Sequence, residues 1–357
     1  LSKIKKRESQ KAVVKIGNVK MKGEVSISDI QFHDYEERFE KYIINKNDIL
    51  IAMTGATVGK VAMSSYDDLL LNQRVGLLRA KSKVISQYFI YNLLHSDRFY
   101  NFCQRTAGGG AQGNISPKMI NEFQIPLPPL SVQEEIVAEI DGYQKIIDGA
   151  RQVVNNYKPT IKIDPDWEMV KLGEVCEVNE KTENPNEVYG ENEFIYIDIT
   201  SVENGTGVVS FDNFVVGDEA PSRARRKVKN RDVLLSTVRP NLKAFGYLKN
   251  VPENAIASTG FAVLTAKEKV IPQFVFYLLF GDALQSQMIS RMGRGSYPSI
   301  NQKDVNELQI PLPPLTVQQE IVTQIEAEQE MVNGNKKLIE IYEQKIKDKI
   351  GEVWGEE

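Results

Sequence analysis

The stretch QIPLPPLSVQEEIVAEI at residues 124–140 recurs as QIPLPPLTVQQEIVTQI at residues 309–325. The two copies are identical at 13 of 17 positions and lie 309 − 124 = 185 residues apart. A duplication with so long a period predicts two similar structural units related by a pseudo-two-fold internal repeat. We therefore expect the two halves of the chain to recognise ligands of the same kind.

Each copy joins a proline-rich stretch to the start of a helix. The prolines fix φ and bias the residue before them toward extended backbone, so the PLPP stretch cannot be helical. Residues 131–134 and 316–319 then have the hydroxyl and carboxyl or amide spacing of a capping box. We expect a helix of at least about 27 residues, on the order of 40 Å long, to begin at each cap.

Apolar residues behind each cap recur at alternating steps of four and three, which is the heptad pattern of a coiled coil. The second helix has Glu328 and Asn335 at two of these positions. An amphipathic core helix is the alternative, but such a helix rarely keeps strict heptads over three repeats. The predicted seam comprises Ile136, Ile140, Tyr143, Ile147, Ala150, Val154 and Tyr157, followed in the second helix by Ile321, Ile325, Val332, Ile339, Tyr342 and Ile346.

Length and composition indicate a two-domain globular protein. A chain of 357 residues exceeds the size at which one hydrophobic core keeps growing. No apolar run approaches the roughly 18 residues that a membrane-spanning helix needs, and no signal peptide is evident, so we expect a cytoplasmic protein without a membrane partner. The two cysteines and two histidines have no metal-ligand spacing, and we expect no metal and no cofactor.

The segments before the two copies have the pattern of mixed α/β (α+β) domains. In each segment, short β-rich runs are followed by a helical stretch and then by a glycine-rich loop. Outside these landmarks the two halves diverge strongly, which indicates a shared architecture with different specificities. The expected elements are strands at residues 48–53, 75–80, 232–237 and 261–266 and helices at residues 86–96 and 272–285.

Sequence signatures of enzymes are weak. The stretch TGATVGKV at residues 54–61 is similar to a phosphate-binding loop, but it has three residues between its glycines instead of four and Val61 where Mg²⁺ needs a hydroxyl. Asp166, Glu168 and Lys171 vaguely suggest a nuclease, yet no second acidic cluster accompanies them. No nucleophile elbow and no zinc-protease helix motif occurs. We therefore predict a non-catalytic protein.

The motifs resemble the specificity subunit of Type I restriction-modification systems over essentially the whole chain. The resemblance rests on the two IPLPPL[ST]VQ junctions, on WEMVKLG at 167–173, on KNDILIAMTGATVGK at 46–60 and on DVLLSTVRP at 232–240. It implies two target-recognition domains, each of which reads half of a split, asymmetric DNA site. It also implies two long antiparallel coiled-coil helices that set the spacing between the half-sites. The first domain has no counterpart of WEMVKLG, so we expect it to lack about 20 opening residues.

The resemblance also implies the partners and the domain boundaries. The partners are double-stranded DNA, two methyltransferase (modification) subunits and the restriction subunits that join this assembly. The implied parts are a first target-recognition domain at 1–123, a first conserved region with its spacer helix at 124–160, a second recognition domain at 161–308 and a second conserved region at 309–357. A coiled-coil scaffold that joins two adaptor domains without nucleic acid is the alternative.

Cations and glycine-rich loops are the candidate DNA contacts. Six cations occupy residues 223–231 of a chain whose net charge is −4, which suggests a phosphate-binding patch, although a solvated strand or loop is the alternative. The glycine-rich stretches at 108–114 and 293–297 permit close backbone approach to a ligand. Thr54, Thr57 and Lys60 are expected to form the loop that corresponds to Thr237, Arg239 and Lys243. The predicted DNA-binding residues are Thr54, Thr57, Lys60, Arg105, Gly109, Gln112, Arg223, Arg225, Arg226, Lys227, Arg239, Lys243, Arg291, Arg294 and Tyr297.

Overall fold

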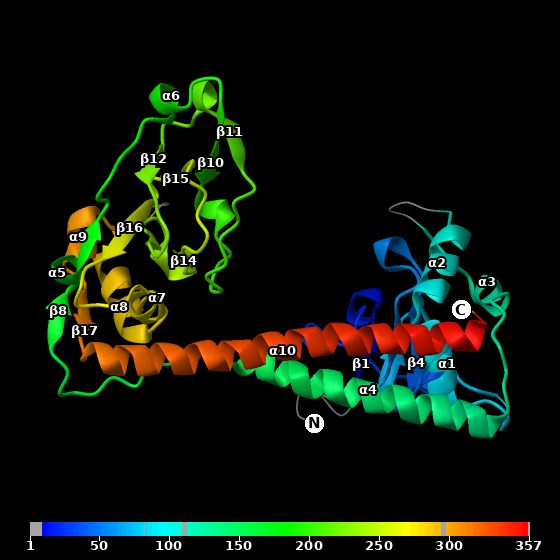
Figure 1. The fold of residues 1–357 in the computed structure, drawn as a ribbon. Helices are drawn as coiled ribbons and strands as arrows, with labels where there is room; N and C mark the ends of the chain where they lie inside the picture. Colours follow the sequence, from blue (N-terminus) through cyan, green and yellow to red (C-terminus); the bar gives the residue numbers. More distant parts are fainter. Residues whose placement is uncertain (1–8, 82, 109–112, 294–297, 356–357) are drawn as a thin grey trace. The chain divides into compact units, whose positions relative to one another are not determined.

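The computed structural model describes residues 9–81, 83–108, 113–293 and 298–355. The chain divides into two compact units, each a mixture of sheets and helices (Figure 1). The first unit comprises residues 1–155 together with 334–357, and the second comprises residues 156–333. The predicted α+β class of both halves is confirmed.

Two sheets form the globular part of the first unit. One sheet has the strand order β2-β1-β6-β3, in which β1 runs parallel to β6 and antiparallel to β2. The other is antiparallel with the order β5-β4-β7. All four residues of β4 are buried, as expected for a short, continuous apolar run. The strands are β1 (Gln10–Val14), β2 (Gln31–Asp34), β3 (Ile43–Ile44), β4 (Ile49–Ala52), β5 (Val61–Met63), β6 (Leu69–Leu71) and β7 (Val75–Leu78).

Three short helices pack on the β5-β4-β7 sheet of this unit. Their apolar residues, among them Ile90 and Phe99, share a buried cluster with Ile49 and Ile51 of β4. The Oγ of a serine accepts a backbone hydrogen bond at the start of each helix, which is the usual N-cap arrangement. The helices are α1 (Gln87–Leu94), α2 (Asp97–Thr106) and α3 (Pro117–Asn121), and the 3₁₀ segments are η1 (Ile16–Asn18), η2 (Glu37–Tyr42) and η3 (Gly55–Thr57).

The second unit repeats this plan and adds strands to it. Its sheets have the orders β11-β10-β15-β12 and β14-β13-β16-β9, and β17 pairs with β8 in a separate ribbon. Like β1, β10 is antiparallel to one neighbour and parallel to the other. The strands are β8 (Met169–Lys171), β9 (Cys176–Val178), β10 (Glu193–Ile197), β11 (Phe214–Val216), β12 (Ala224–Lys227), β13 (Val233–Ser236), β14 (Phe245–Tyr247), β15 (Ala255–Ser258), β16 (Phe261–Ala266) and β17 (Gln309–Pro311).

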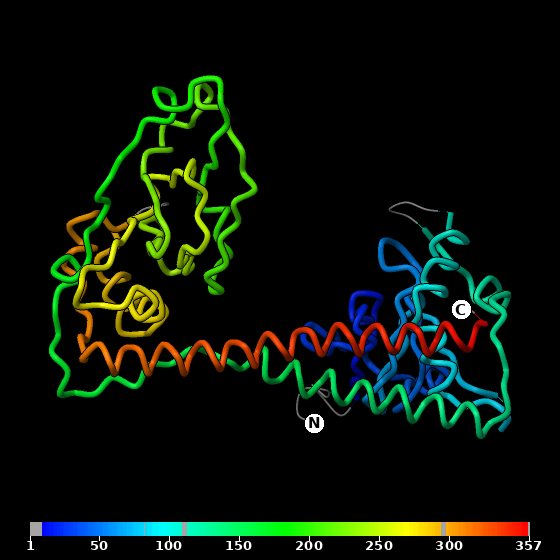
Figure 2. The backbone as a smooth tube through the Cα atoms, viewed as in Figure 1, coloured from blue at the N-terminus to red at the C-terminus, as the bar shows by residue number. Residues whose placement is uncertain are grey.

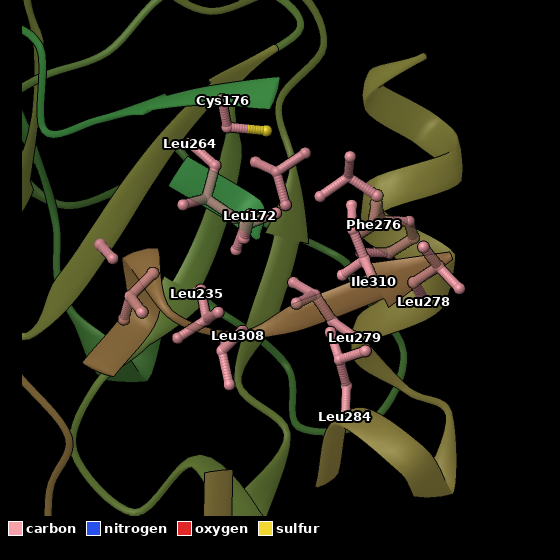
Figure 3. Close-up of a cluster of buried hydrophobic side chains, with 14 of the residues drawn as sticks. Leu172, Cys176, Leu235, Leu264, Phe276, Leu278, Leu279, Leu284, Leu308 and Ile310 are labelled. Atoms are coloured by element: carbon pink, nitrogen blue, oxygen red, sulfur yellow. The ribbon is translucent and has the colours of Figure 1, made fainter. Parts of the chain in front are cut away.

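The core of the second unit joins its sheet to its helices. Figure 3 shows Leu235 and Leu264 from neighbouring strands, with Leu279 of the following helix and Ile310 of β17 in the same buried cluster. The WEMVKLG stretch supplies β8, which pairs with the second proline junction in the register Ile310 to Val170. The helices are α5 (Leu172–Val175), α6 (Pro185–Val188), α7 (Pro272–Leu279), α8 (Asp282–Arg291) and α9 (Gln302–Asn306), and the 3₁₀ segments are η4 (Ile199–Ser201), η5 (Gly217–Glu219) and η6 (Pro240–Leu242).

The helix predicted over residues 272–285 is in fact two helices. The chain leaves α7 at Phe280, and Gly281 has the extended backbone of an N-cap residue before α8 begins. The first unit is divided in the same way between α1 and α2, with Ser96 as the cap. The apolar residues on both sides of the break concealed it from a periodicity reading.

The two duplicated stretches lead into the two longest helices, α4 (Leu130–Asn156, 27 residues) and α10 (Leu315–Trp354, 40 residues). Both helices begin one residue before the predicted caps Ser131 and Thr316, so the capping-box prediction is wrong. The backbone N–H groups of Gln133 and Gln318 instead donate to the carbonyls of Pro129 and Pro314. The prolines therefore hold the N-cap positions.

In the first unit, α4 and the part of α10 from residue 334 onward run antiparallel (Figure 2). Lys349 Nζ lies 2.9 Å from Glu139 Oε2, and the rings of Tyr143 and Tyr342 have centroids 5.3 Å apart. Later residues of α4 thus face earlier residues of α10, as predicted. Among the seam residues, Ile140, Ile147, Ala150, Ile325 and Val332 are buried, and Ile136, Tyr143, Val154, Tyr157, Ile321, Ile339, Tyr342 and Ile346 are half-buried.

Candidate nucleic-acid interface

In the first unit, the loop after β4 lies beside the end of the glycine-rich loop. The backbone N–H of Ile115 donates to the carbonyl of Met53 at 2.9 Å, and that of Gly55 donates to Gly113 at 2.8 Å. Thr54 forms an isolated β-bridge with Asn114. Two of the segments predicted to contact DNA are therefore neighbours.

The second unit builds the same arrangement from a different sequence. The backbone N–H of Ile300 donates to the carbonyl of Thr237 at 2.9 Å, and that of Arg239 donates to Pro298 at 2.8 Å. Val238 and Ser299 form the matching β-bridge. The predicted residues Gly109, Gln112, Arg294 and Tyr297 lie outside the described residues, so each pair of loops is defined at its base.

These hydrogen bonds establish which residues of the two loops correspond. Arg239 takes the place of Gly55, and Lys243 takes the place of Gly59, an offset of 184 (239 − 55 and 243 − 59). The predicted correspondence of the loops holds, but Thr54 matches Val238 rather than either predicted cation. All four residues have positive φ: 70° and 83° for Gly55 and Gly59, and 48° and 57° for Arg239 and Lys243.

The left-handed conformation is costly for Arg239 and Lys243. A side chain in this region of φ and ψ costs roughly 1–2 kcal/mol, whereas glycine adopts it freely. Backbone strain of this kind concentrates at functional sites. The sequence contains no signal for it, because the strain becomes visible only when the two loops are superimposed by their hydrogen bonds.

The two strained side chains have different surroundings. Arg239 is exposed at the start of η6. Lys243 is half-buried, and its Nζ donates to the carbonyl of Phe280 at 3.3 Å. The carbonyl of Lys243 also accepts the N–H of Gly205 at 3.0 Å. Arg239 is thus placed at the surface, while Lys243 ties its loop to the end of α7.

The polar groups of the loop after β4 are largely engaged within the loop. Thr57 Oγ1 donates to the carbonyl of Thr54 at 3.1 Å, and Thr54 Oγ1 is buried without a hydrogen-bond partner among the described residues. Lys60 is half-buried just before β5. Arg105, in contrast, is exposed in the last turn of α2, two residues before the glycine-rich loop.

The basic run at residues 223–231 follows β12, which is an edge strand of its sheet. Arg223 is exposed, and the half-buried Arg225 donates from Nη1 to the carbonyl of Ala224 at 2.7 Å. Lys229 forms an ion pair with Glu180 at 3.2 Å. The run therefore does not present all of its charges to one surface.

Arg226 and Lys227 of this run are turned into the protein. Burial lowers the pKa of Arg226, whose buried Nε has no partner among the described residues. Burial alone would lower the pKa of Lys227, but hydrogen bonds to Tyr189 and Glu183 outweigh it and raise that pKa. The Nζ of Lys227 lies 3.2 Å from Glu183 and donates to the Glu253 carbonyl at 2.8 Å. Its charge is already balanced inside the unit.

Arg291 also has internal partners. Its Nη1 donates to the carbonyl of Gln287 at 3.0 Å, and its Nη2 donates to the carbonyl of Glu307 at 3.3 Å. The guanidinium thereby joins the end of α8 to the end of α9. Arg291 and its sequence counterpart Arg105, which is exposed, have different environments.

Catalytic and metal-binding geometry is not found in the part of the chain that the structure describes. No group of three or more histidine, cysteine, aspartate or glutamate side chains there is arranged to hold a metal ion. Burial raises the pKa values of Cys103 and Cys176 to about 12, so neither is an activated thiolate. None of the helices in the described ranges has both the length and the apolar character needed to cross a bilayer.

Known proteins share both the sequence and the fold. The "Type I restriction enzyme MjaVIII specificity subunit" of Methanocaldococcus jannaschii is 24% identical over 340 residues, covering 87% of this chain and 79% of the relative. The "Putative type I restriction enzyme MjaX specificity subunit" of the same organism is 27% identical over 354 residues, covering 88% and 79%.

Two solved structures have a similar fold. One, from work on complex assembly and conformational transition of the type I R-M system, has a TM-score of 0.61 at 19% identity and covers 96% of this chain and 91% of its own. The S subunit of a type I system from M. genitalium has a TM-score of 0.51 at 16% identity, covering 88% and 84%.

The family described as "Type I restriction modification DNA specificity domain" matches the chain twice, over residues 2–156 and 165–341. The two matches cover the two repeats that the duplicated stretch predicted, and together they span most of the chain. The chain therefore belongs to the family of type I restriction-modification DNA specificity subunits, which recognise DNA and are not themselves catalytic.

Proposed function

We propose that this subunit recognises a bipartite, asymmetric DNA target, with one recognition domain for each half-site. In this proposal α4 and α10 are the spacer between the half-sites, and the subunit docks methyltransferase and restriction subunits that carry out the chemistry. The chain supplies sequence recognition, and its partners modify or cut the DNA.

The paired loops carry this proposal. Both units place the loop after a buried central strand, β4 or β13, against the end of a second loop by the same three backbone contacts. Identical construction from divergent sequences is what two domains need to read different bases in one manner. Arg239 is the best-placed base or phosphate contact, because it is exposed and its backbone is held in a costly conformation.

The helix pair of the first unit supports the proposed docking of methyltransferase subunits. Heptad geometry places Ile146, Val153 and Leu338 along one flank of the seam, and their side chains are 37%, 44% and 36% exposed. Ile341, 51% exposed, lies next to Leu338 on α10. The opposite flank has the ion pair between Arg151 and Glu343. An exposed apolar stripe beside a polar flank fits an amphipathic helix of a protein partner.

The salt dependence of DNA binding tests the proposed function. Purified complex of this chain with its methyltransferase subunits is titrated against a DNA duplex that contains its target and against a scrambled duplex, at several salt concentrations. We expect selective binding to the target, and affinity for both duplexes should fall as salt rises because phosphate contacts release counterions. Equal affinity for both duplexes, or affinity that does not depend on salt, contradicts the proposal and favours the scaffold alternative.

A further inference from the structure

Gln133 and Gln318, the junction glutamines, are completely buried in the first turns of α4 and α10. Both side chains are 0% exposed, although glutamine is ordinarily a surface residue. They occupy the same position of the duplicated stretch, 318 − 133 = 185 residues apart. A buried amide needs partners for its carbonyl and for both of its N–H groups.

In the first unit, Gln133 makes three hydrogen bonds that connect α4 to the recognition domain. Its Oε1 accepts the backbone N–H of Ser86 at 2.9 Å. Its Nε2 donates to the carbonyl of Val84 at 2.9 Å and to that of Pro128 at 2.8 Å. One side chain thus joins the helix to the segment that caps α1 and to the proline junction.

In the second unit, Gln318 repeats all three bonds. Its Oε1 accepts the backbone N–H of Ile271 at 2.8 Å. Its Nε2 donates to the carbonyl of Lys269 at 3.2 Å and to that of Pro313 at 2.8 Å. Every partner lies 185 residues after its counterpart in the first unit.

All six partner groups belong to the backbone, although the residues that bear them differ. Val84 corresponds to Lys269, and Ser86 corresponds to Ile271. An attachment made only through backbone groups tolerates divergence of the recognition domains while keeping one geometry. An apolar side chain would fill the same space, but it would leave one buried N–H and two buried carbonyls without their partner, each at a cost of roughly 1–3 kcal/mol.

We propose that the junction glutamines are positioning residues that fix the direction of each spacer helix relative to its recognition domain. In fixing that direction, they determine which spacing between half-sites the subunit accepts. This inference rests on the proposed function, since only a bipartite target has a spacing. Neither glutamine contacts DNA in this scheme, and base preference within each half-site stays with the loops.

The test uses the full chain in complex with its methyltransferase subunits. Duplexes first selected by the unmodified complex are remade with the spacer unchanged or changed by one base pair in either direction. For Gln318→Met we expect the preference for the selected spacer to fall about tenfold, whereas preference for the half-site bases is unchanged. A purely structural role would lower affinity for all duplexes alike and leave the ratio between them intact.

Gln324→Met is the matched control, because Gln324 is exposed on the same helix and bonds only with Glu328 at 2.9 Å among its described contacts. It should keep the spacer preference of the unmodified complex. A folded Gln318→Met complex with that preference overturns the inference. If Gln318→Met does not fold, Gln318→Asn decides by the same measurement, since it keeps the amide but is one methylene shorter. Failure of the proposed function itself is distinguishable, because the unmodified complex would then select no half-sites.

Discussion

At the scale of single residues, the clearest departure from the sequence pattern is that Arg239 occupies a position that the first unit gives to Gly55. Both have positive φ, but only glycine adopts that conformation without strain. The chain therefore keeps a strained arginine at the surface of a recognition loop. A role that requires its side chain explains why glycine does not occur there.

Substitution of Arg239 separates backbone strain from DNA contact. Arg239→Gly relieves roughly 1–2 kcal/mol of strain but adds about 0.4–1 kcal/mol of unfolded-state freedom, so urea denaturation should show unchanged or slightly higher stability. Arg239→Ala keeps the strain. Both variants should bind one half-site at least about fivefold more weakly, since a bidentate arginine–base contact contributes about 1–3 kcal/mol. Unchanged DNA affinity in both variants would show that the side chain makes no contact.

Buried thiols and phenols predict that the chain loses stability at alkaline pH. Burial raises the pKa of Cys103 and of Tyr91 to about 12, from ordinary values of 9.0 and 10.0. The folded state then keeps protons that the unfolded state has released, so the stabilisation is complete below pH 9 and is lost as pH rises toward 12. Urea midpoints measured from pH 8 to 11 should decline, and Cys103→Ala should decline less steeply. Midpoints that stay level would contradict the assigned burial.

The sequence predicted these residues unevenly. The loops near Arg105, Arg223 and Arg239 were found from charge and glycine content, which local composition reveals. The internal bonding of Lys227 and Arg291 was not, because their partners Glu183 and Glu307 come from other segments of the fold. The junction glutamines were missed for the same reason: Gln133 bonds to backbone 47 and 49 residues away.

At the scale of helices and strands, periodicity predicted the long helices but not their first residues. Heptad spacing depends only on the helix itself, and both α4 and α10 are at least as long as expected. The starts depend on a competition between Ser131 and Pro129 for the N-cap position. Proline holds that position, since the carbonyl of Pro129 accepts the N–H groups of Val132 and Gln133.

Two adjacent isoleucines of α4 test the division between seam and docking flank. Ile147 is 1% exposed and Ile146 is 37% exposed. Ile147→Ala should destabilise the first unit by about 2–5 kcal/mol in urea denaturation, because it leaves a cavity in the seam. Ile146→Glu should leave stability within about 0.5 kcal/mol of the unmodified chain. It should nevertheless reduce co-purification with the methyltransferase subunit.

The opposite pattern would refute the proposed docking surface. If Ile146→Glu co-purifies with the methyltransferase subunit as the unmodified chain does, the exposed flank is not where that partner binds. If Ile147→Ala is as stable as the unmodified chain, the heptad positions do not form the packed seam. Each outcome is read separately, because stability and association are measured on the same purified variants.

At the scale of the whole chain, one repeat accounts for most of what the sequence predicted. The duplicated stretch alone required two similar units, and the two family matches over residues 2–156 and 165–341 confirm them. What the repeat could not provide is the base specificity. The loops that differ most between the units depend on long-range contacts such as that between Arg239 and Pro298.

The most direct measurement is selection from a pool of random-sequence DNA duplexes by the complex of this chain with its methyltransferase subunits. Sequencing of the bound duplexes should show two different short half-sites separated by a fixed number of unspecified base pairs. Arg239→Ala should relax selection in only one of them. Enrichment of a single uninterrupted motif, or of no motif at all, would contradict the central claim that two similar domains each recognise one part of a divided target.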